Sequence, residues 1–414
     1  MNKYTGNTNP FNTLVIVAAL GYFVDIYDLL LFSVERIDSL KEILGPAADM
    51  DVIKKTGREL LNWQMGGMLI GGIFWGILGD KKGRLSVLFG SILLYSLANI
   101  ANGFVQTVPQ YALLRFISGF GLAGELGAGI TLVSETMSKE KRGIGTMIVA
   151  TVGVFGAVVA GFMSNVIENW RYSFFIGGAM GLALLITRIG VFESGMFEKV
   201  KEQNVSRGNL LSLFSSRKKA FKYLSIIMVT VPVWYVMGIL VTFAPEMMKS
   251  MGVSHFVPNP GKCIMFAYLG ITAGDLVSGL VSQLIKSRKK TLAAFLFLTL
   301  IGIVLYFTVA GFSEVVFYSV ITFIGFATGY WAVFMSTASE LFGTNIRSTV
   351  TTTAPNFVRG SLIVVSGAVG FFESYTNGVN AAIIVGIIVF ILAGIALWNL
   401  EETFNKDLNY SEEE

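Results

Sequence analysis

Long apolar runs separated by short polar segments dominate this chain of 414 residues. A helix needs about 20 mainly apolar residues to cross a bilayer, whereas a membrane strand alternates apolar and polar residues over about ten positions. Runs of the first kind recur twelve times, at residues 13–33, 62–79, 85–104, 110–132, 144–165, 171–191, 221–245, 262–285, 291–311, 315–338, 350–372 and 379–399. The pattern therefore predicts an all-α integral membrane protein with twelve transmembrane helices.

The composition fits lipid better than water as the solvent. Hydrophobic residues make up 53% of the chain and charged residues 14%, against about a quarter charged in soluble domains. One cysteine, Cys263, and one histidine, His255, leave no internal disulfide and argue against a histidine metal site. Phosphate-binding loops and nucleophile elbows are absent from the sequence, and the net charge of +4 is modest. We expect no enzyme activity, no cofactor, no metal and no nucleic-acid partner.

The charges of the connecting segments predict an orientation. Loops after even-numbered runs hold 19 basic residues, eight of them between Arg188 and Lys222, and loops after odd-numbered runs hold 8. Basic loops stay on the cytoplasmic side, so we expect a multi-pass protein of the inner (plasma) membrane with both termini inside. The first run is too long for a signal peptide core and carries two aspartates, so it is expected to remain as a permanent helix.

The chain divides after the sixth run, at its longest polar cytoplasmic connection, Gly190 to Phe221. A weak repeat supports this division, because a glutamate and an arginine seven residues apart follow run four and again run ten, with an offset of 205 residues. Parallel halves of six spans are a known transporter design. The predicted units are an N-terminal six-helix bundle (1–191), a cytoplasmic linker (192–220), a C-terminal six-helix bundle (221–399) and a cytoplasmic tail (400–414).

The segment G-I-L-G-D-K-K-G-R, from Gly76 to Arg84, closely resembles the cytoplasmic loop signature of the major facilitator superfamily. Glycines permit close helix approach and tight reversal, while an aspartate and an arginine can hold helix ends. After run eight, K-S-R-K-K resembles a second copy that lacks the aspartate. The residues expected to form gates are Gly76, Asp80, Gly83 and Arg84 with the repeated pairs Glu135 and Arg142, and Glu340 and Arg347.

Other segments resemble one branch of that superfamily, the proton symporters of sugars, phosphate and organic acids. They are R-F-I-S-G-F-G-L-A-G-E-L-G-A-G from Arg115, W-R-Y-S-F-F from Trp170, E-S-G-M-F from Glu193 and the tail E-E-T-F-N-K-D-L from Glu401. In the third, Gly195 replaces the family's proline. The resemblance implies two six-helix bundles related by a pseudo-two-fold axis, set in membrane lipids and working by alternating access. The oligomeric state stays open, with a monomer as one option.

Several ionisable residues lie inside predicted spans, where a charge is costly and usually has a function or a partner. Asp25 and Asp28 are three residues apart, on one helical face. Nearby buried carboxylates can carry protons, and the stretch resembles the D-x-[FY]-D of aromatic-acid and phosphate proton symporters. Arg115 matches Asp28 in depth, so it could be that carboxylate's partner or a substrate ligand. Glu125 could relay a proton or close a gate between helices.

The second half offers its own candidates. Asp275 and Arg359 lie near mid-depth, and P-N-F-V-R-G loosely resembles the N-x-x-G-R of organic-acid transporters. Arg359 could grip the carboxylate of a substrate or neutralise Asp275, and Asn356 could add a neutral hydrogen-bonding group. Four aromatic residues in runs seven and ten could line a pocket or serve packing: Trp234, Tyr235, Tyr330 and Trp331.

These features favour a secondary active transporter, with proton-coupled symport of a small organic anion such as a monocarboxylate or aromatic acid. A proton-coupled carrier of sugars or other neutral solutes is the alternative. A phosphate symporter, a drug exporter and a non-transporting membrane sensor follow in that order. The expected partners are the small-molecule substrate, protons and membrane lipids.

Overall fold

A computed structural model describes residues 9, 12–82, 84–125, 127, 133, 137, 142–193 and 213–404. Within these ranges the side chains of 79–85, 142–144, 146–147, 189–193, 344–345 and 347–348 are not described.

Helices account for nearly all of the described chain. The first are α1 (Thr13–Leu44), α2 (Met50–Lys82), α3 (Arg84–Asn102), α4 (Val108–Leu122), α6 (Arg142–Val166) and α7 (Trp170–Glu193). The others are α8 (Arg217–Tyr235), η3 (Val236–Val241), α9 (Ala244–Ser250), α10 (Pro260–Leu284), α11 (Arg288–Thr308), η4 (Ala310–Phe312), α12 (Glu314–Thr328), α13 (Trp331–Leu341), α14 (Thr344–Glu373) and α15 (Gly378–Asn399). Among the described residues, nine helical segments are long and apolar enough to span a membrane. The chain is thus an all-helical membrane protein, and the number twelve stays a prediction.

Two predicted spans contain irregular backbone. The span predicted at 221–245 runs through α8 into a π-helical segment, η3, before α9 begins. The span predicted at 315–338 is broken between α12 and α13 at Gly329 and Tyr330. A Cβ on Gly329 would lie only 2.6 Å from the Cα of Gly274 on α10, so the break sits where two backbones touch.

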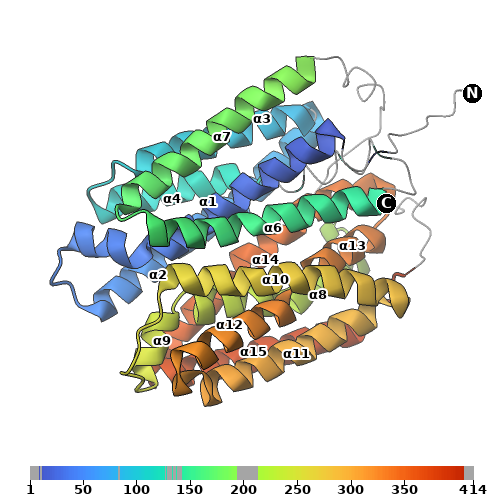
Figure 1. Ribbon diagram of the computed structural model, residues 1–414. Coiled ribbons are helices and arrows are strands. Elements are labelled where there is room, and N and C mark those ends of the chain that lie inside the picture. Colours follow the sequence, from blue (N-terminus) through green and yellow to red (C-terminus); the bar gives the residue numbers. More distant parts are fainter. Residues whose placement is uncertain are drawn as a thin grey trace, which may run out of the picture.

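The helix contacts of the first and second parts of the chain mirror each other. Helix α1 packs on α6 and α7, and α8 packs on α14 and α15. Likewise α2 packs on α4, and α10 on α12. Figure 1 shows the blue-to-green helices on one side of the molecule and most yellow-to-red helices on the other. The contacts of α6 with α10 and of α2 with α14 join the two sets.

Ion pairs link these two sets at the end where α1 passes into α2. Arg36 Nη1 lies 2.6 Å from Glu246 Oε1 on α9, and both side chains are buried. Arg36 Nη2 also donates to the carbonyl of Thr242, 3.2 Å away. Nearby, Glu373 of α14 pairs with Arg58 of α2 at 2.8 Å and with Lys54. These ion pairs therefore hold the two sets of helices together at this end of the molecule.

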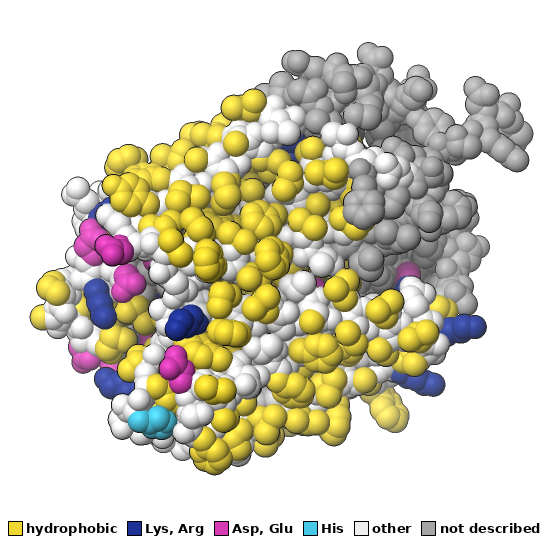
Figure 2. Space-filling view, in the orientation of Figure 1, with side chains coloured by type: hydrophobic (Ala, Val, Ile, Leu, Met, Phe, Trp, Pro, Cys, Tyr) yellow, Lys and Arg dark blue, Asp and Glu magenta, His cyan; other side chains and the backbone are white. Residues whose placement is uncertain are grey.

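The surface matches a bilayer. Figure 2 shows hydrophobic side chains over the middle of the visible face and charged side chains towards its two ends. Large apolar residues are exposed along α11 and α15, including Phe297, Val304 and Ile391. Since no aqueous protein exposes such helix faces at this scale without a partner, lipid is the environment that fits them.

Candidate functional site

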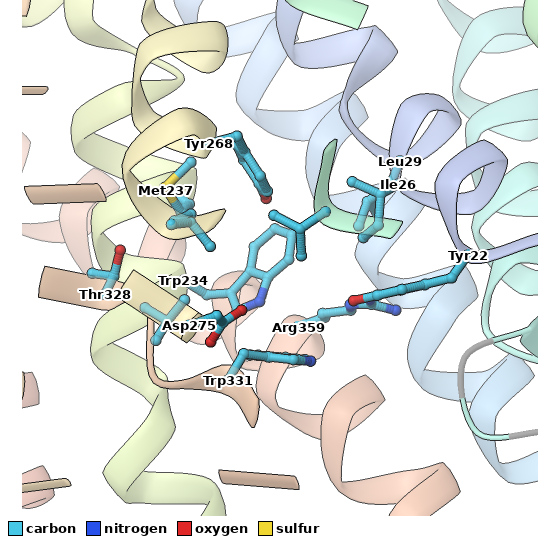
Figure 3. A pocket seen from close by; sticks show the side chains of 13 residues that line it. Tyr22, Ile26, Leu29, Trp234, Met237, Tyr268, Asp275, Thr328, Trp331 and Arg359 are labelled. Atoms are coloured by element: carbon cyan, nitrogen blue, oxygen red, sulfur yellow. The ribbon is translucent and has the colours of Figure 1, made fainter. Parts of the chain in front are cut away.

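A small cavity lies between the two sets of helices. Its lining comes from α1, α6, α8, η3, α10, α12, α13 and α14: Tyr22, Ile26, Leu29, Val154, Val233, Trp234, Met237, Tyr268, Ile271, Asp275, Thr328, Trp331 and Arg359. Figure 3 shows Ile26 and Leu29 of α1 on one side of this space, Trp234, Met237 and Tyr268 on the other, and Arg359 between them, drawn beside Tyr22. The cavity volume is about 30 Å³. That admits water but is far below the roughly 300–1,000 Å³ of ligand pockets, so this conformation is closed around its centre.

Arg359 is the positively charged residue in the lining of this cavity. Its side chain is 1% exposed, and its Nε and Nη1 groups have no hydrogen-bond partner. The Cζ atom lies 5.7 Å from the centre of the Trp331 ring, within range of a cation–π contact. No carboxylate forms an ion pair with Arg359 among the residues that the structure describes. A buried guanidinium with unused N–H groups can bind an anion that enters the cavity.

Asp275 does not neutralise Arg359. Its Oδ1 accepts a hydrogen bond of 3.1 Å from the backbone N–H of Ala332, at the start of α13. Tyr330, which precedes α13, supplies no side-chain cap. The carboxylate of Asp275 therefore satisfies the helix start created by the break in the chain, as an N-cap residue would.

The four aromatic candidates separate into two pairs. Trp234 and Trp331 line the cavity, and the Nε1–H of Trp331 is buried without an acceptor. The hydroxyl of Tyr235 donates to the carbonyl of Ala382 at 2.8 Å, and that of Tyr330 to the carbonyl of Val229 at 3.1 Å. The tyrosines thus join helices, while the tryptophans face the cavity. Sequence reasoning missed Tyr22 and Tyr268, which complete the aromatic wall.

Asp25 is fully buried on α1, and neither carboxylate oxygen has a hydrogen-bond partner. The charged groups that act on it electrostatically are Arg359, Glu125, Asp28 and Arg188. A carboxyl group in this setting can take up and release a proton, because no hydrogen bond or ion pair to a described residue fixes its protonation state.

Asp28 and Arg115 lie within electrostatic range of each other, but no hydrogen bond joins them. Arg115 instead donates to Asn99 Oδ1 at 2.9 Å and to Asn102 Oδ1 at 3.2 Å. Its Cζ lies 4.7 Å from the centre of the Phe174 ring. Arg115 is absent from the lining of the central cavity, so the residues around it form a separate buried polar cluster.

Glu125 is bound by an arginine that sequence reasoning had counted among the loop charges. Arg188, on α7, forms a two-pronged ion pair with the carboxylate of Glu125, and its Nη1 lies 3.1 Å from Oε2. Both side chains are 1% exposed. Arg188 falls inside the predicted span 171–191, a signal that could have marked it as a buried partner.

Two further candidates lie at the contact between the two sets of helices. Asn356 donates to the carbonyl of Ala123 at 3.0 Å, and its Oδ1 is buried without a donor. A Cβ on Gly76 would lie 3.8 Å from methyl groups of Thr352 and Thr353 on α14. Asn356 therefore joins α14 to the end of α4, and Gly76 places α2 in ordinary contact with α14; neither residue is in the cavity lining.

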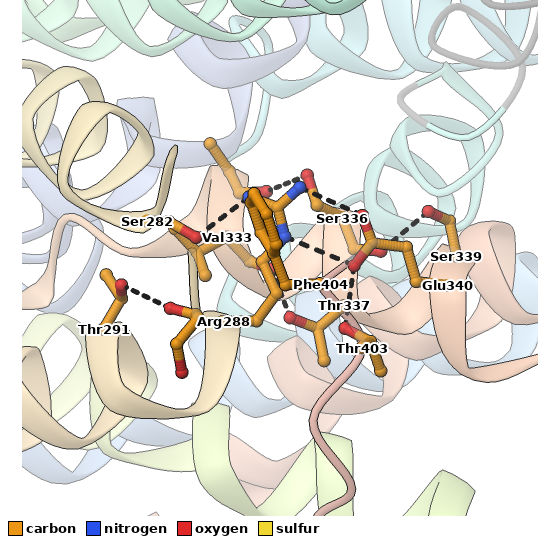
Figure 4. Close-up of polar contacts among 12 residues, drawn as sticks. Ser282, Arg288, Thr291, Val333, Ser336, Thr337, Ser339, Glu340, Thr403 and Phe404 are labelled. Atoms are coloured by element: carbon orange, nitrogen blue, oxygen red, sulfur yellow. Dashed lines mark hydrogen bonds and ion pairs between the residues drawn. The ribbon is translucent and has the colours of Figure 1, made fainter. Parts of the chain in front are cut away.

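Glu340 anchors a polar cluster at the opposite end from the Arg36–Glu246 pair. Arg288 binds it through Nη2 at 3.0 Å and Nε at 3.2 Å, and Thr403 donates to it at 2.7 Å. Figure 4 shows this cluster, in which α11, α13 and the chain after α15 meet. The other gate residues cannot be placed in the same way, because Gly83, Glu135 and the side chains of Asp80, Arg84, Arg142 and Arg347 lie outside the described residues.

The arrangement of helices, cavity and apolar surface defines a class of protein, the helical membrane proteins that enclose a binding space between two packed sets of helices. The chain belongs to the Major Facilitator Superfamily, whose family model matches residues 41–367. It is therefore a membrane transporter and not an enzyme, and the resemblance predicted from the loop signature is confirmed.

Relatives indicate the kinds of solute that similar proteins handle. The 3-(3-hydroxy-phenyl)propionate transporter of Escherichia coli is 27% identical over 358 residues, or 81% of this chain and 82% of the relative. The "Probable 4-methylmuconolactone transporter" of Cupriavidus pinatubonensis is 26% identical over 354 residues, which cover 81% of this chain and 79% of the relative. The benzoate transport protein of Acinetobacter baylyi is 26% identical over 209 residues, which cover 47% of this chain and 43% of the relative.

In the part of the chain that the structure describes, no group of three or more histidine, cysteine, aspartate or glutamate residues is placed to hold a metal ion. The cavity lining itself offers the guanidinium of Arg359, aromatic rings and the carboxyl group of Asp275. These groups suit binding and proton exchange.

Proposed function

We propose that this transporter carries a small organic anion, a monocarboxylate or aromatic acid, by proton-coupled symport. The observation that carries the proposal is Arg359, a buried cation in an aromatic cavity with two unused N–H positions. A carboxylate matches the fork of a guanidinium, and an aromatic ring matches the walls formed by Trp234, Trp331 and Tyr268. The names of the relatives, three of which refer to aromatic acids or a lactone, support the same solute class.

A carrier of neutral sugars fits the cavity less well. Sugar recognition depends on many neutral hydrogen-bonding groups, but the polar lining consists mainly of Arg359, Asp275 and two tyrosines. Asp275 already accepts a bond from the backbone. An uncompensated buried arginine would also be costly in a site that never received a negative charge.

Asp25 is the proposed proton carrier. Its carboxyl group has no hydrogen-bond partner, and it is one helical turn from Tyr22, which lines the cavity. When the cavity holds an anion beside Arg359, less positive charge remains to stabilise an ionised Asp25, so substrate and proton bind together. Because each favours binding of the other, substrate and proton would cross the membrane together, which is symport.

The proposed transport cycle rocks two six-helix bundles, residues 1–191 and 221–399, about the cavity. The Arg36–Glu246 and Glu373 ion pairs would close the end proposed to face away from the cytoplasm. The Glu340–Arg288 cluster would hold the helix ends at the cytoplasmic side. Both termini are proposed to lie there.

Purified protein in liposomes tests the substrate class. Labelled benzoate inside the vesicles should exchange with external benzoate, while benzamide, its neutral amide with nearly the same shape, should not compete. Glucose and inorganic phosphate serve as probes for the alternatives. Equal competition by benzamide, or exchange of glucose alone, would contradict an anion carrier.

The proton role is tested in the same vesicles with two substitutions at one position. Asp25→Asn should abolish accumulation driven by a pH gradient while exchange at equal concentrations persists. Asp25→Glu is the matched control, because it keeps a titratable carboxyl and should retain part of the accumulation. If the Asp25→Asn protein still concentrates the substrate, Asp25 is not the coupling site.

A further inference from the structure

A basic groove lies on the surface at the turn between α10 and α11. It shares no lining residue with the central cavity. It is lined by the turn, by the first part of α11 and by the end of α15: Ile285, Lys286, Lys289, Lys290, Leu397 and Trp398 among others. Its volume is about 630 Å³. Two of its three ammonium groups are uncommitted, because no hydrogen bond or ion pair of Lys286 or Lys290 side chains occurs within the described chain.

The groove is positive because of its lysine side chains and not because of free backbone N–H groups at the start of α11. Lys289 Nζ donates to the carbonyl of Trp398 at 2.8 Å. The carboxylate of Glu402 accepts from the N–H groups of Arg288 at 2.9 Å and Lys289 at 3.3 Å. The N–H of Lys290 is bound by the hydroxyl of Ser287 at 3.1 Å. With the helix start satisfied, the free ammonium groups remain as the anion-binding elements.

The groove continues into an apolar surface. Trp398, at the end of α15, is 83% exposed. Exposed tryptophans at helix ends are typical of the membrane interface, because the indole ring is amphipathic. From there the exposed side chains of Ile391 and Ile395 run along α15, and those of Phe297 and Val304 along α11. A ligand with an anionic head and long apolar chains would be complementary to both parts.

We propose that this groove binds the headgroup of an anionic phospholipid, with the acyl chains lying along α11 and α15. The lysines meet the phosphate, Trp398 lies at the glycerol level, and the helices contact the tails. A basic pocket between helices on the cytoplasmic side is a known form of lipid recognition. A free phosphate ion shares the headgroup chemistry but would leave the apolar part of the site unused.

The test measures thermal stabilisation of the purified full chain in detergent by added phosphatidylglycerol. Phosphatidylcholine with the same acyl chains and inorganic phosphate are separate arms. Phosphatidylglycerol should stabilise most, and the other two little. In Lys286→Ala/Lys290→Ala the apparent affinity for phosphatidylglycerol should fall by about five-fold for each lysine, the equivalent of roughly 1 kcal/mol per basic residue.

The matched control is Lys249→Ala/Lys262→Ala, which removes equal charge from exposed positions at the opposite end of the helices. It should respond to phosphatidylglycerol like the parent protein. Trp398→Ala should weaken binding of both lipids, because it removes the shared apolar contact. An equal loss in both lysine pairs, an equal response to the two lipids, or stabilisation by inorganic phosphate alone would overturn the lipid site.

Discussion

Arg188 and Arg359 are both almost completely buried in membrane-spanning helices, yet their surroundings are opposite. Arg188 has a carboxylate partner, Glu125, bound by two nitrogens. Arg359 faces a cavity, contacts a tryptophan ring and has two nitrogens without any partner. Burial of a charge therefore does not by itself indicate function. A paired charge serves the fold, whereas an unpaired one in a cavity is available to a ligand.

The largest expected effect comes from breaking the paired arginine. Arg188→Gln leaves Glu125 buried without a cation, which should cost about 3–5 kcal/mol of stability. Replacing both partners, in Arg188→Met/Glu125→Met, should recover most of this loss because no buried charge remains. Thermal unfolding in detergent measures both. If the double variant is as unstable as the single one, the pair does more than neutralise charge.

Arg359 should behave in the opposite way. Arg359→Lys keeps the charge but loses a two-pronged contact of roughly 1.5–3 kcal/mol, so the half-saturation concentration for the anion should rise about tenfold to hundredfold. Stability should change little, since Arg359 has no ion-pair partner among the described residues and lysine keeps a cation beside Trp331. Uptake titrations and thermal unfolding of one preparation give both values. A large drop in stability with unchanged half-saturation would assign Arg359 to the fold.

The contrast extends to the acids, where a smaller effect is expected. Asp275→Asn should be close to neutral in stability, because an amide oxygen can still accept from the N–H of Ala332. Asp275→Ala should lose about 1 kcal/mol. Adding Asp275→Asn to Arg359→Gln should not restore transport. A clear restoration would show that the two residues neutralise each other during the cycle.

The mildest case lies at the surface, outside the membrane spans. The pKa of the Glu402 carboxyl lies below its ordinary value of 4.5: partial burial acts to raise it, but hydrogen bonds from Ser287, Phe404, Arg288 and Lys289 outweigh that effect. A carboxyl with a lowered pKa stabilises the fold above pH 4.5, and the contribution fades as the pH falls below that value. Glu402→Gln should lower stability at pH 7 by about 0.2–1 kcal/mol. The difference from the parent should disappear in unfolding scans at progressively lower pH, and a constant difference would contradict this role.

Hydropathy predicted approximately where the long helices lie, because a helix needs about 20 mainly apolar residues to cross a bilayer. It did not predict the breaks in two of them. Gly329 looks like any other membrane glycine until Gly274 of another helix is placed against it. The extension of α1 to Leu44, well beyond the predicted end at 33, was missed because charged residues interrupt the apolar run there. Glu35 and Arg36 are buried by protein, whereas Lys41 and Glu42 in the last turn are exposed.

The partners of buried charges were the least predictable feature. Arg188 and Glu125 are 63 residues apart, and Arg36 and Glu246 lie on helices from different parts of the chain. Nothing local in a sequence records which two residues will meet. Arg36 lies beyond the predicted span 13–33 and was counted as a loop charge, whereas Arg188 lies inside the predicted span 171–191, which marks it as buried but does not name its partner. Spacing suggested an ion pair between Asp28 and Arg115, but depth along a helix does not specify which way a side chain turns. Asn99 and Asn102 bind the arginine instead.

The Arg36–Glu246 ion pair makes the two mouths of the transporter thermodynamically unequal. Both side chains are at most 5% exposed, and separating them breaks the ion pair through which two buried charges neutralise each other. A solute that binds from that side must supply the free energy that favours the closed, ion-paired conformation. Each 1.4 kcal/mol of this free energy weakens the solute's apparent affinity about tenfold. At the other end, the ion pair of Glu340 with Arg288 joins two helices of one set, so among the described residues it gives no comparable link between the sets for a solute to break. The same cavity would then display two different apparent affinities, one for loading and one for release.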